Sequence, residues 1–167
     1  KVVKMQKYVL YKTDPATCIK NEYYSVDFYE GVADITPSRP LIIWLHGGGF
    51  KFGKKKSGGL PLWSKTFARR GYTCAAINYR LSKKHPLKNF ADLVEGCADA
   101  IEDVNEAIQY FKKHCAIFKI DTSRIILGGN SAGGMIALQA VYSSPAEMAM
   151  LMQRGGAAGT VAHHHKQ

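Results

Sequence analysis

Ser131 lies between glycine pairs in the segment Gly-Gly-Asn-Ser-Ala-Gly-Gly, residues 128–134. The apolar run 124–127 before it is typical of a strand, and residues 135–141 after it indicate a helix. A Gly-x-Ser-x-Gly motif between a strand and a helix predicts a tight turn with an exposed serine hydroxyl, near a helix N-terminus that favours negative charge. This chemistry suits a serine nucleophile. A glycine-rich turn that holds a phosphate, or only reverses the chain, would look the same, so the motif alone leaves both readings open.

A second glycine motif, His-Gly-Gly-Gly-Phe at residues 46–50, directly follows the apolar run 41–45. Successive glycines let backbone N–H groups turn toward a ligand without side chains in the way. Such donors stabilise the oxyanion of a tetrahedral intermediate, and losing one of them costs about 3–4 kcal/mol. A flexible loop is the alternative for this motif alone. The two motifs in this order, each after a strand, favour a catalytic site.

The elements that must position these motifs follow from hydrophobic periodicity. Apolar and aromatic content predicts strands at residues 5–12, 22–30, 41–45, 72–78 and 124–127, and apolar spacing predicts helices at 60–70, 90–114 and 135–141, with a further short helix opened by Pro145. After residue 40 the strands and helices alternate, which indicates an α/β fold with a mostly parallel sheet and helices on both faces. Ligands bind such sheets at the carboxyl ends of the strands, where both glycine motifs fall.

Four cysteines occur, without a metal-type spacing, and we predict neither a metal site nor a cofactor. Cys74 lies in an apolar strand and is expected in the core. Cys97 and Cys115 are expected to share the helix 90–114 and its end. At 1.5 Å rise per residue they would lie about 27 Å apart, which is beyond disulfide reach.

The composition is typical of a soluble globular protein with one domain: 167 residues, 46% hydrophobic and 22% charged. The net charge is +10. Its basic runs, 51–56 and 83–84, lack interleaved aromatic residues, so we expect solvated surface and no nucleic-acid partner. No apolar run approaches the roughly 20 residues of a membrane span. Residues 1–6 lack the apolar segment of a secretory signal and do not begin with Met, so we expect a trimmed N-terminus and leave the compartment open.

Three segments carry a resemblance to a known family: residues 46–50, Asn-Tyr-Arg-Leu-Ser at 78–82, and residues 121–124 leading into 128–134. With them the chain resembles α/β-hydrolases of the hormone-sensitive-lipase-like carboxylesterase and lipase group over roughly residues 21–145. The resemblance implies Ser131 as nucleophile acting on a small-molecule ester. It also implies an oxyanion hole from the N–H groups of Gly48, Gly49 and Ala132, on a loop supported by His46 and Gly47.

Other positions near these motifs allow more than one interpretation. Asn130 stands where the family often has Asp, Glu or Ser, a departure that should leave the turn intact. The segment Tyr-Arg-Leu at 79–81 is expected to anchor a loop near the site and not to contact substrate. Four apolar side chains could line a substrate wall or simply pack in the core: Phe50, Phe52, Leu60 and Trp63.

The remaining catalytic groups of the family are missing from their usual place. Its chain order is Ser, then Asp or Glu, then His. Glu147 is the only acidic residue after Ser131, and nothing there would orient His163, His164 or His165 as a base, so we interpret the histidines as a linker or expression remnant.

We therefore expect residues 1–167 to be the N-terminal portion of a single α/β-hydrolase domain, inactive alone. Its missing C-terminal part, or a second chain, would complete the fold. Without it, the strand at 124–127 would be an exposed apolar edge. The alternatives are a non-catalytic hydrolase-fold binding protein and a related amidase or peptidase, because fold does not settle substrate.

Overall fold

The computed structural model describes residues 2–13 and 22–142. Its strands are β1 (Val3–Leu10), β2 (Ser25–Gly31), β3 (Arg39–Leu45), β4 (Thr73–Ile77) and β5 (Ile120–Gly129). Its helices are the 3₁₀ turn η1 (Glu22–Tyr24) and α1 (Leu60–Ala68), α2 (Phe90–Lys113), α3 (Cys115–Phe118) and α4 (Ala132–Tyr142).

The strands form one sheet in the order β1-β2-β4-β3-β5. The first two strands pair antiparallel, and β2 also pairs antiparallel with β4. β3 runs parallel to both β4 and β5. The parallel part of the sheet thus consists of β3, β4 and β5, in the region where strands and helices alternate. The N-terminal strands β1 and β2 extend the sheet on the β4 side in antiparallel orientation.

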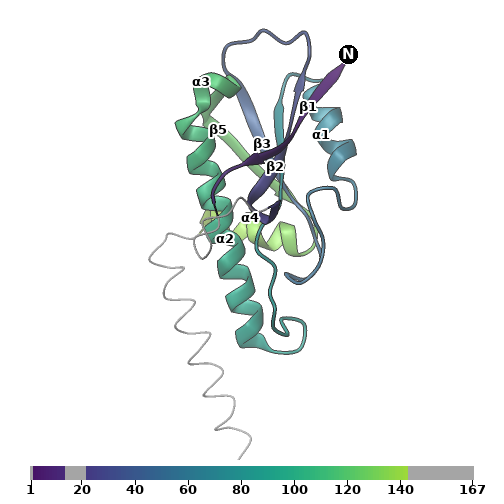
Figure 1. Ribbon diagram of the computed structural model, residues 1–167, viewed down its shortest axis with the longest axis vertical. Coiled ribbons are helices and arrows are strands. Elements are labelled where there is room, and N and C mark those ends of the chain that lie inside the picture. Colours follow the sequence, from purple (N-terminus) through teal and green to yellow (C-terminus); the bar gives the residue numbers. More distant parts are fainter. Residues whose placement is uncertain (1, 14–21, 143–167) are drawn as a thin grey trace, which may run out of the picture.

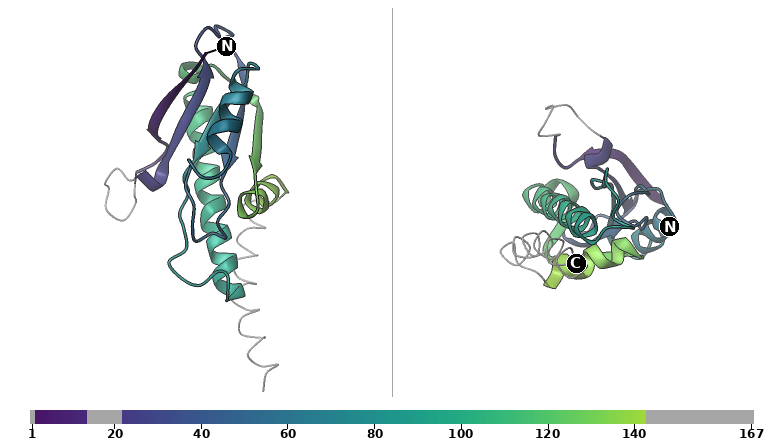
Figure 2. Two further views of the ribbon diagram at one scale, coloured as in Figure 1. Left: turned by 90° about the vertical axis from the view of Figure 1, so that its right-hand side faces the viewer. Right: turned by 90° about the horizontal axis from the view of Figure 1, so that it is seen from below.

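Helices cover both faces of the sheet, as the apolar periodicity predicts (Figures 1 and 2). On one face, α2 and α4 bury Ile101, Val104 and Ile136 against strand residues such as Leu41 and Ile43. On the other face, α1 packs Leu60 and Ala68 against β3 and β4. The sheet is therefore sandwiched between two apolar clusters, which fixes the strands whose ends carry the glycine motifs.

The register of the parallel strands brings the two glycine motifs together. Leu45 at the end of β3 pairs with Gly129 at the end of β5. Consequently the loop that starts at His46 and the turn that contains Ser131 leave the sheet side by side, at the lower end of the sheet in Figure 1.

The long helix ends one residue earlier than predicted, and this separates the two cysteines. α2 stops at Lys113, and Cys115 opens the separate helix α3, which ends at Phe118 and is capped by Lys119 with a left-handed φ of 54°. Cys74 is fully buried, and Cys74, Cys97 and Cys115 are free thiols. β2 likewise starts at Ser25, because residues 22–24 form a 3₁₀ turn instead of strand.

The prediction that the basic run 51–56 is solvated surface is wrong at one position. Lys55 is almost completely buried, because Asp27 and Ser25 offer its ammonium group an anion and a hydroxyl inside the fold. Lys54 and Lys56 on either side of it are exposed, as expected.

The predicted helix from Pro145, Glu147 and the three C-terminal histidines lie outside the described residues. Within the described segments 2–13 and 22–142, no helix is both long enough and apolar enough to span a bilayer.

Candidate active site

Ser131 occupies the apex of the turn between β5 and α4 and is exposed to solvent. Its φ is 51°, in the left-handed region that a residue with a side chain rarely adopts. Two backbone hydrogen bonds close the turn: Gly133 N–H donates to Asn130 O at 2.9 Å, and Met135 N–H donates to Ser131 O at 3.1 Å. The predicted strand, turn and helix are therefore present, with the serine hydroxyl at the start of α4.

Close backbone approach explains the glycines around this serine. A Cβ at Gly133 would lie 2.0 Å from Leu45 O, and one at Gly129 would lie 2.7 Å from the same oxygen. Side chains at either position would push α4 away from the end of β3. The glycines thus let the serine turn sit directly on the strand that begins the second motif.

The loop between β3 and α1, residues 46–59, is called the glycine loop below. Gly47 is the residue of this loop that borders the turn around Ser131. A Cβ there would lie 3.4 Å from Ser131 Cβ and 3.2 Å from Asn130 O. Gly48 and Gly49 follow with φ values of 123° and 62°, which only glycine adopts readily. Ala132, the third residue expected to point an N–H group into the site, is buried at the first position of α4. The backbone at Gly47 and the Ser131 side chain are therefore neighbours.

His46 is buried under the loop. Its Nδ1 lies 2.6 Å from Gly47 O, and its ring stacks on Tyr79 with centroids 4.3 Å apart. Burial lowers the pKa of His46, and the hydrogen bond to Gly47 O only partly opposes this. A neutral ring that donates from Nδ1 to a carbonyl keeps no proton on Nε2. His46 therefore lies buried between Gly47 and Tyr79, and its role in supporting the loop stays a prediction.

Three consecutive residues after β4 hold three different parts of this region. Asn78 Oδ1 accepts a hydrogen bond from Lys55 N–H at 2.6 Å, and Tyr79 Oη donates to His46 O at 2.5 Å. Arg80 donates from its backbone N–H and from Nε to the buried carboxylate of Asp103 on α2, at 2.7 and 3.1 Å. Asn78 and Tyr79 thus fasten the loop after β3 at Lys55 and at His46, so the anchoring role expected of residues 79–81 is confirmed for Tyr79, whereas Arg80 is bound to α2.

The apolar side chains near the loop divide between core and surface. Phe50 and Leu60 are 1% exposed and belong to the core clusters. Trp63 packs on Trp44, with ring centroids 5.5 Å apart. Phe52 is exposed. Ordinary packing therefore accounts for Phe50, Leu60 and Trp63.

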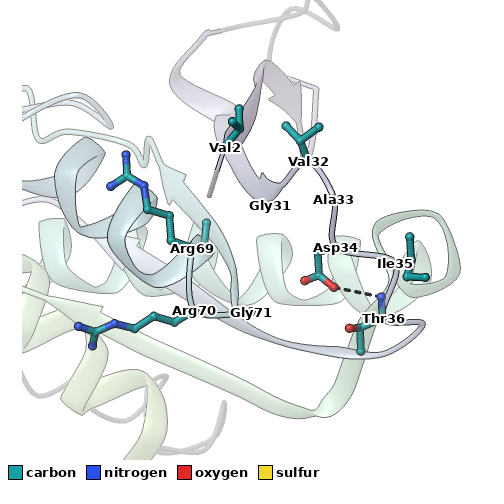
Figure 3. A pocket seen from close by; sticks show the side chains of 11 residues that line it. Val2, Gly31, Val32, Ala33, Asp34, Ile35, Thr36, Arg69, Arg70 and Gly71 are labelled. Atoms are coloured by element: carbon teal, nitrogen blue, oxygen red, sulfur yellow. Dashed lines mark hydrogen bonds between the residues drawn. The ribbon is translucent and has the colours of Figure 1, made fainter.

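A pocket between the residue 31–36 segment and the end of α1 lies far from Ser131. It lies where β2 ends and before β3 begins, whereas the site lies at the carboxyl ends of β3 and β5. Figure 3 shows Asp34 turned to the Thr36 N–H, while the Arg69 and Arg70 side chains extend away from Ile35. Asp34 is also paired with the buried Arg39 at 3.4 Å, so its carboxylate is already neutralised within the fold, and the pocket is not part of the candidate active site.

Sequence reasoning missed the buried ionic partners of the site. Asp27 and Asp103 are both 0% exposed, and they hold Lys55 and Arg80 respectively. For Asp27, the sequence signal was a carboxylate inside the otherwise apolar run 26–29. A buried carboxylate requires a cation, so this position could have predicted a buried ion pair. Asp103 gave no such signal, since α2 carries acids on much of its surface.

Comparison with known proteins assigns the chain to a family. The sequence model of the BD-FAE family, a hormone-sensitive-lipase-like group of α/β-hydrolases, matches residues 26–156. Because this match covers most of the chain, the protein belongs to the BD-FAE family.

Several curated relatives are named as ester hydrolases or as hydrolases. Phenmedipham hydrolase of Pseudarthrobacter oxydans is 36% identical over 110 residues, which are 65% of this chain and 21% of that protein. A probable carboxylesterase 6 of Arabidopsis thaliana is 33% identical over 125 residues, 68% of this chain and 33% of the relative. The chain thus spans about a fifth to a third of the length of these two relatives.

Solved esterase structures share the fold. Esterase B of Lactobacillus rhamnosis superposes with a TM-score of 0.66 at 20% identity, covering 89% of this chain and 43% of that one. Thermogutta terrifontis esterase 2, phosphorylated by paraoxon, gives a TM-score of 0.60 at 25% identity, covering 81% of this chain and 46% of its own. The fold is that of the α/β-hydrolases, and this chain covers less than half the length of each of these two structures.

Proposed function

We propose that the full-length protein carrying this chain is a serine carboxylesterase. The observation that carries the proposal is the contact between the two glycine motifs, where a Cβ at Gly47 would lie 3.4 Å from Ser131 Cβ. An exposed serine in a left-handed turn thus stands beside a loop whose next two residues have positive φ. The relatives named as ester hydrolases support the same class of reaction.

In this proposal, Ser131 Oγ attacks the ester carbonyl carbon. The carbonyl oxygen becomes negative in the tetrahedral intermediate and receives hydrogen bonds from the N–H groups of Gly48, Gly49 and Ala132. The partial positive charge at the N-terminus of α4 stabilises the negative charge on the same oxygen. Collapse of the intermediate expels the alcohol and leaves an acyl-serine, which water then hydrolyses.

The proton of Ser131 must go to a base that we place outside these 167 residues. His46 is unsuited to the task, because it is 1% exposed and its Nδ1 is committed to Gly47 O. We propose that the chain is the N-terminal portion of one α/β-hydrolase domain and has little turnover alone. β5 lies at the sheet edge, and Ile126 on it is 46% exposed, which favours further strands beside it.

Labelling with a fluorophosphonate tests the proposal. The full-length protein should be modified at Ser131, and Ser131→Ala should abolish the labelling without changing the thermal unfolding temperature appreciably. The related Thermogutta esterase 2 is described as phosphorylated by paraoxon, which makes a phosphorus electrophile a suitable probe. A folded full-length protein that is not labelled would contradict the proposal and favour a binding role for the fold.

A further inference from the structure

Leu87 is presented at the tip of a rigid turn between β4 and α2. The backbone N–H groups of Lys88 and Asn89 both donate to His85 O, at 3.1 and 2.9 Å. The Asn89 side chain caps α2 by accepting from Asp92 N–H at 3.1 Å, and Asp92 Oδ2 accepts from His85 N–H at 3.1 Å. These bonds hold the turn at both ends. Nevertheless, Leu87 itself is 66% exposed.

The Leu87 side chain lies against Gly49 in the glycine loop. A Cβ on Gly49 would come within 2.6 Å of Leu87 Cδ2, and all three nearest atoms belong to Leu87. Gly49 is two residues from Gly47, which borders Ser131, so their Cα atoms are at most about 7 Å apart. An isobutyl group is thus held beside the backbone proposed to bind the oxyanion, with most of its surface open to solvent.

An exposed leucine in this position is not explained by core packing. Its side chain is outside both apolar clusters of the sheet. Removing its apolar surface from water is favourable, and a hydrocarbon group on the substrate would do so. The same contact would exclude water from the N–H groups beneath, which strengthens their hydrogen bonds to a developing negative charge.

We propose that Leu87 is a specificity-determining residue that contacts a hydrocarbon group directly flanking the ester carbonyl. This inference rests on the proposed esterase function and deepens it. It names the substrate class as esters whose acyl or alcohol part is apolar next to the carbonyl. Leu87 takes no part in proton or group transfer, so its effect lies in how strongly such esters are bound relative to smaller ones.

Kinetics of the full-length protein with two ester series test this proposal. One series lengthens the acyl chain of a p-nitrophenyl ester from acetate to butyrate to hexanoate, and the other lengthens the alcohol of an alkyl acetate in the same steps. Leu87→Ala should reduce the preference in kcat/KM for longer over shortest ester about tenfold in at least one series, as expected for a lost apolar contact. The change should lie mainly in KM.

Ile117→Ala is the matched control, because Ile117 is a 76% exposed aliphatic residue on α3 at the other end of the molecule. It should leave both series unchanged. An unaltered preference in both series for Leu87→Ala would overturn the Leu87 assignment. Fluorophosphonate labelling of Ser131 separates the two hypotheses: labelling with unaltered preferences refutes only the role of Leu87, and no labelling of the folded wild-type protein refutes the esterase function.

Discussion

Lys55 Nζ lies 3.1 Å from Asp27 Oδ1, and the two side chains are only 2% and 0% exposed. Ser25 Oγ accepts a second hydrogen bond from the same ammonium group at 2.8 Å, and the Tyr8 ring lies 4.0 Å from it. This buried ion pair joins the loop after β3 to the antiparallel strand β2. The far half of the glycine loop is therefore fastened to the N-terminal hairpin.

Breaking this pair should destabilise the fold strongly. Lys55→Met leaves the Asp27 carboxylate buried without its cation, and we expect a loss of about 3–5 kcal/mol in the free energy of unfolding. Urea denaturation followed by circular dichroism measures it. The double variant Lys55→Met, Asp27→Leu should recover much of the loss. Lys84→Met removes an exposed partner of Glu95 and should have no measurable effect; equal behaviour of Lys55→Met and this control would contradict the prediction.

The close approach of α4 to β3 predicts opposite outcomes for two neighbouring glycines. Gly133→Ala would place a methyl carbon 2.0 Å from Leu45 O and should lower the free energy of unfolding by at least about 3 kcal/mol. Gly134→Ala meets its nearest atom, Gly129 O, at 3.4 Å and should be tolerated. Thermal unfolding of the two variants compares them directly. Equal loss in both would show that helix geometry, and not contact with Leu45, sets the requirement.

The Tyr79 hydroxyl should matter for both stability and turnover. Tyr79→Phe leaves the buried His46 carbonyl without this donor, which we expect to cost about 1–3 kcal/mol of unfolding free energy. Because that carbonyl begins the glycine loop, kcat for the ester hydrolysis proposed for the full-length protein should fall about tenfold or more with a smaller change in KM. Tyr72→Phe, where the ring packs edge-on against Phe67 beneath the opposite face, is the control and should change neither quantity.

His46 should make stability depend on pH in the mildly acidic range. Burial lowers its pKa below the ordinary value of 6.5, so the unfolded chain binds a proton at a higher pH than the folded one. The contribution of neutral His46 to the free energy of unfolding is then fully present above about pH 6.5, and it is lost progressively as the pH falls below this value. Urea denaturation at about pH 7.5 and about pH 5.5 measures the difference, which His46→Gln should diminish. An unchanged difference in this variant would assign the effect to another group.

Much of the fold and of the candidate site could be predicted from the sequence, because the relevant signals are local. Apolar runs locate β3, β4 and β5, although β5 begins four residues before and ends two residues after the predicted run 124–127, and the spacing of apolar residues defines α2 within one residue of its observed end. Ser131 and Gly47–Gly49 stand out because tight turns and exposed N–H groups require small residues at fixed spacing. The break between α2 and α3 was missed, since it falls at His114, where the backbone leaves the helical conformation (φ −106°, ψ 23°) without a glycine or proline to signal it.

Only the tertiary structure decided which distant residues meet. The register of β3 with β5 places Gly47 beside Ser131, although 84 positions separate them. Lys54, Lys55 and Lys56 have the same side chain, but the tertiary structure buries only Lys55, which pairs with Asp27, and leaves the other two exposed to solvent. The tertiary structure also places the exposed Leu87 side chain against Gly49. Residue type and local spacing determine the elements and the reactive group, whereas long-range packing of the sheet determines its surroundings, because burial and contact depend on chain segments that the local pattern does not contain.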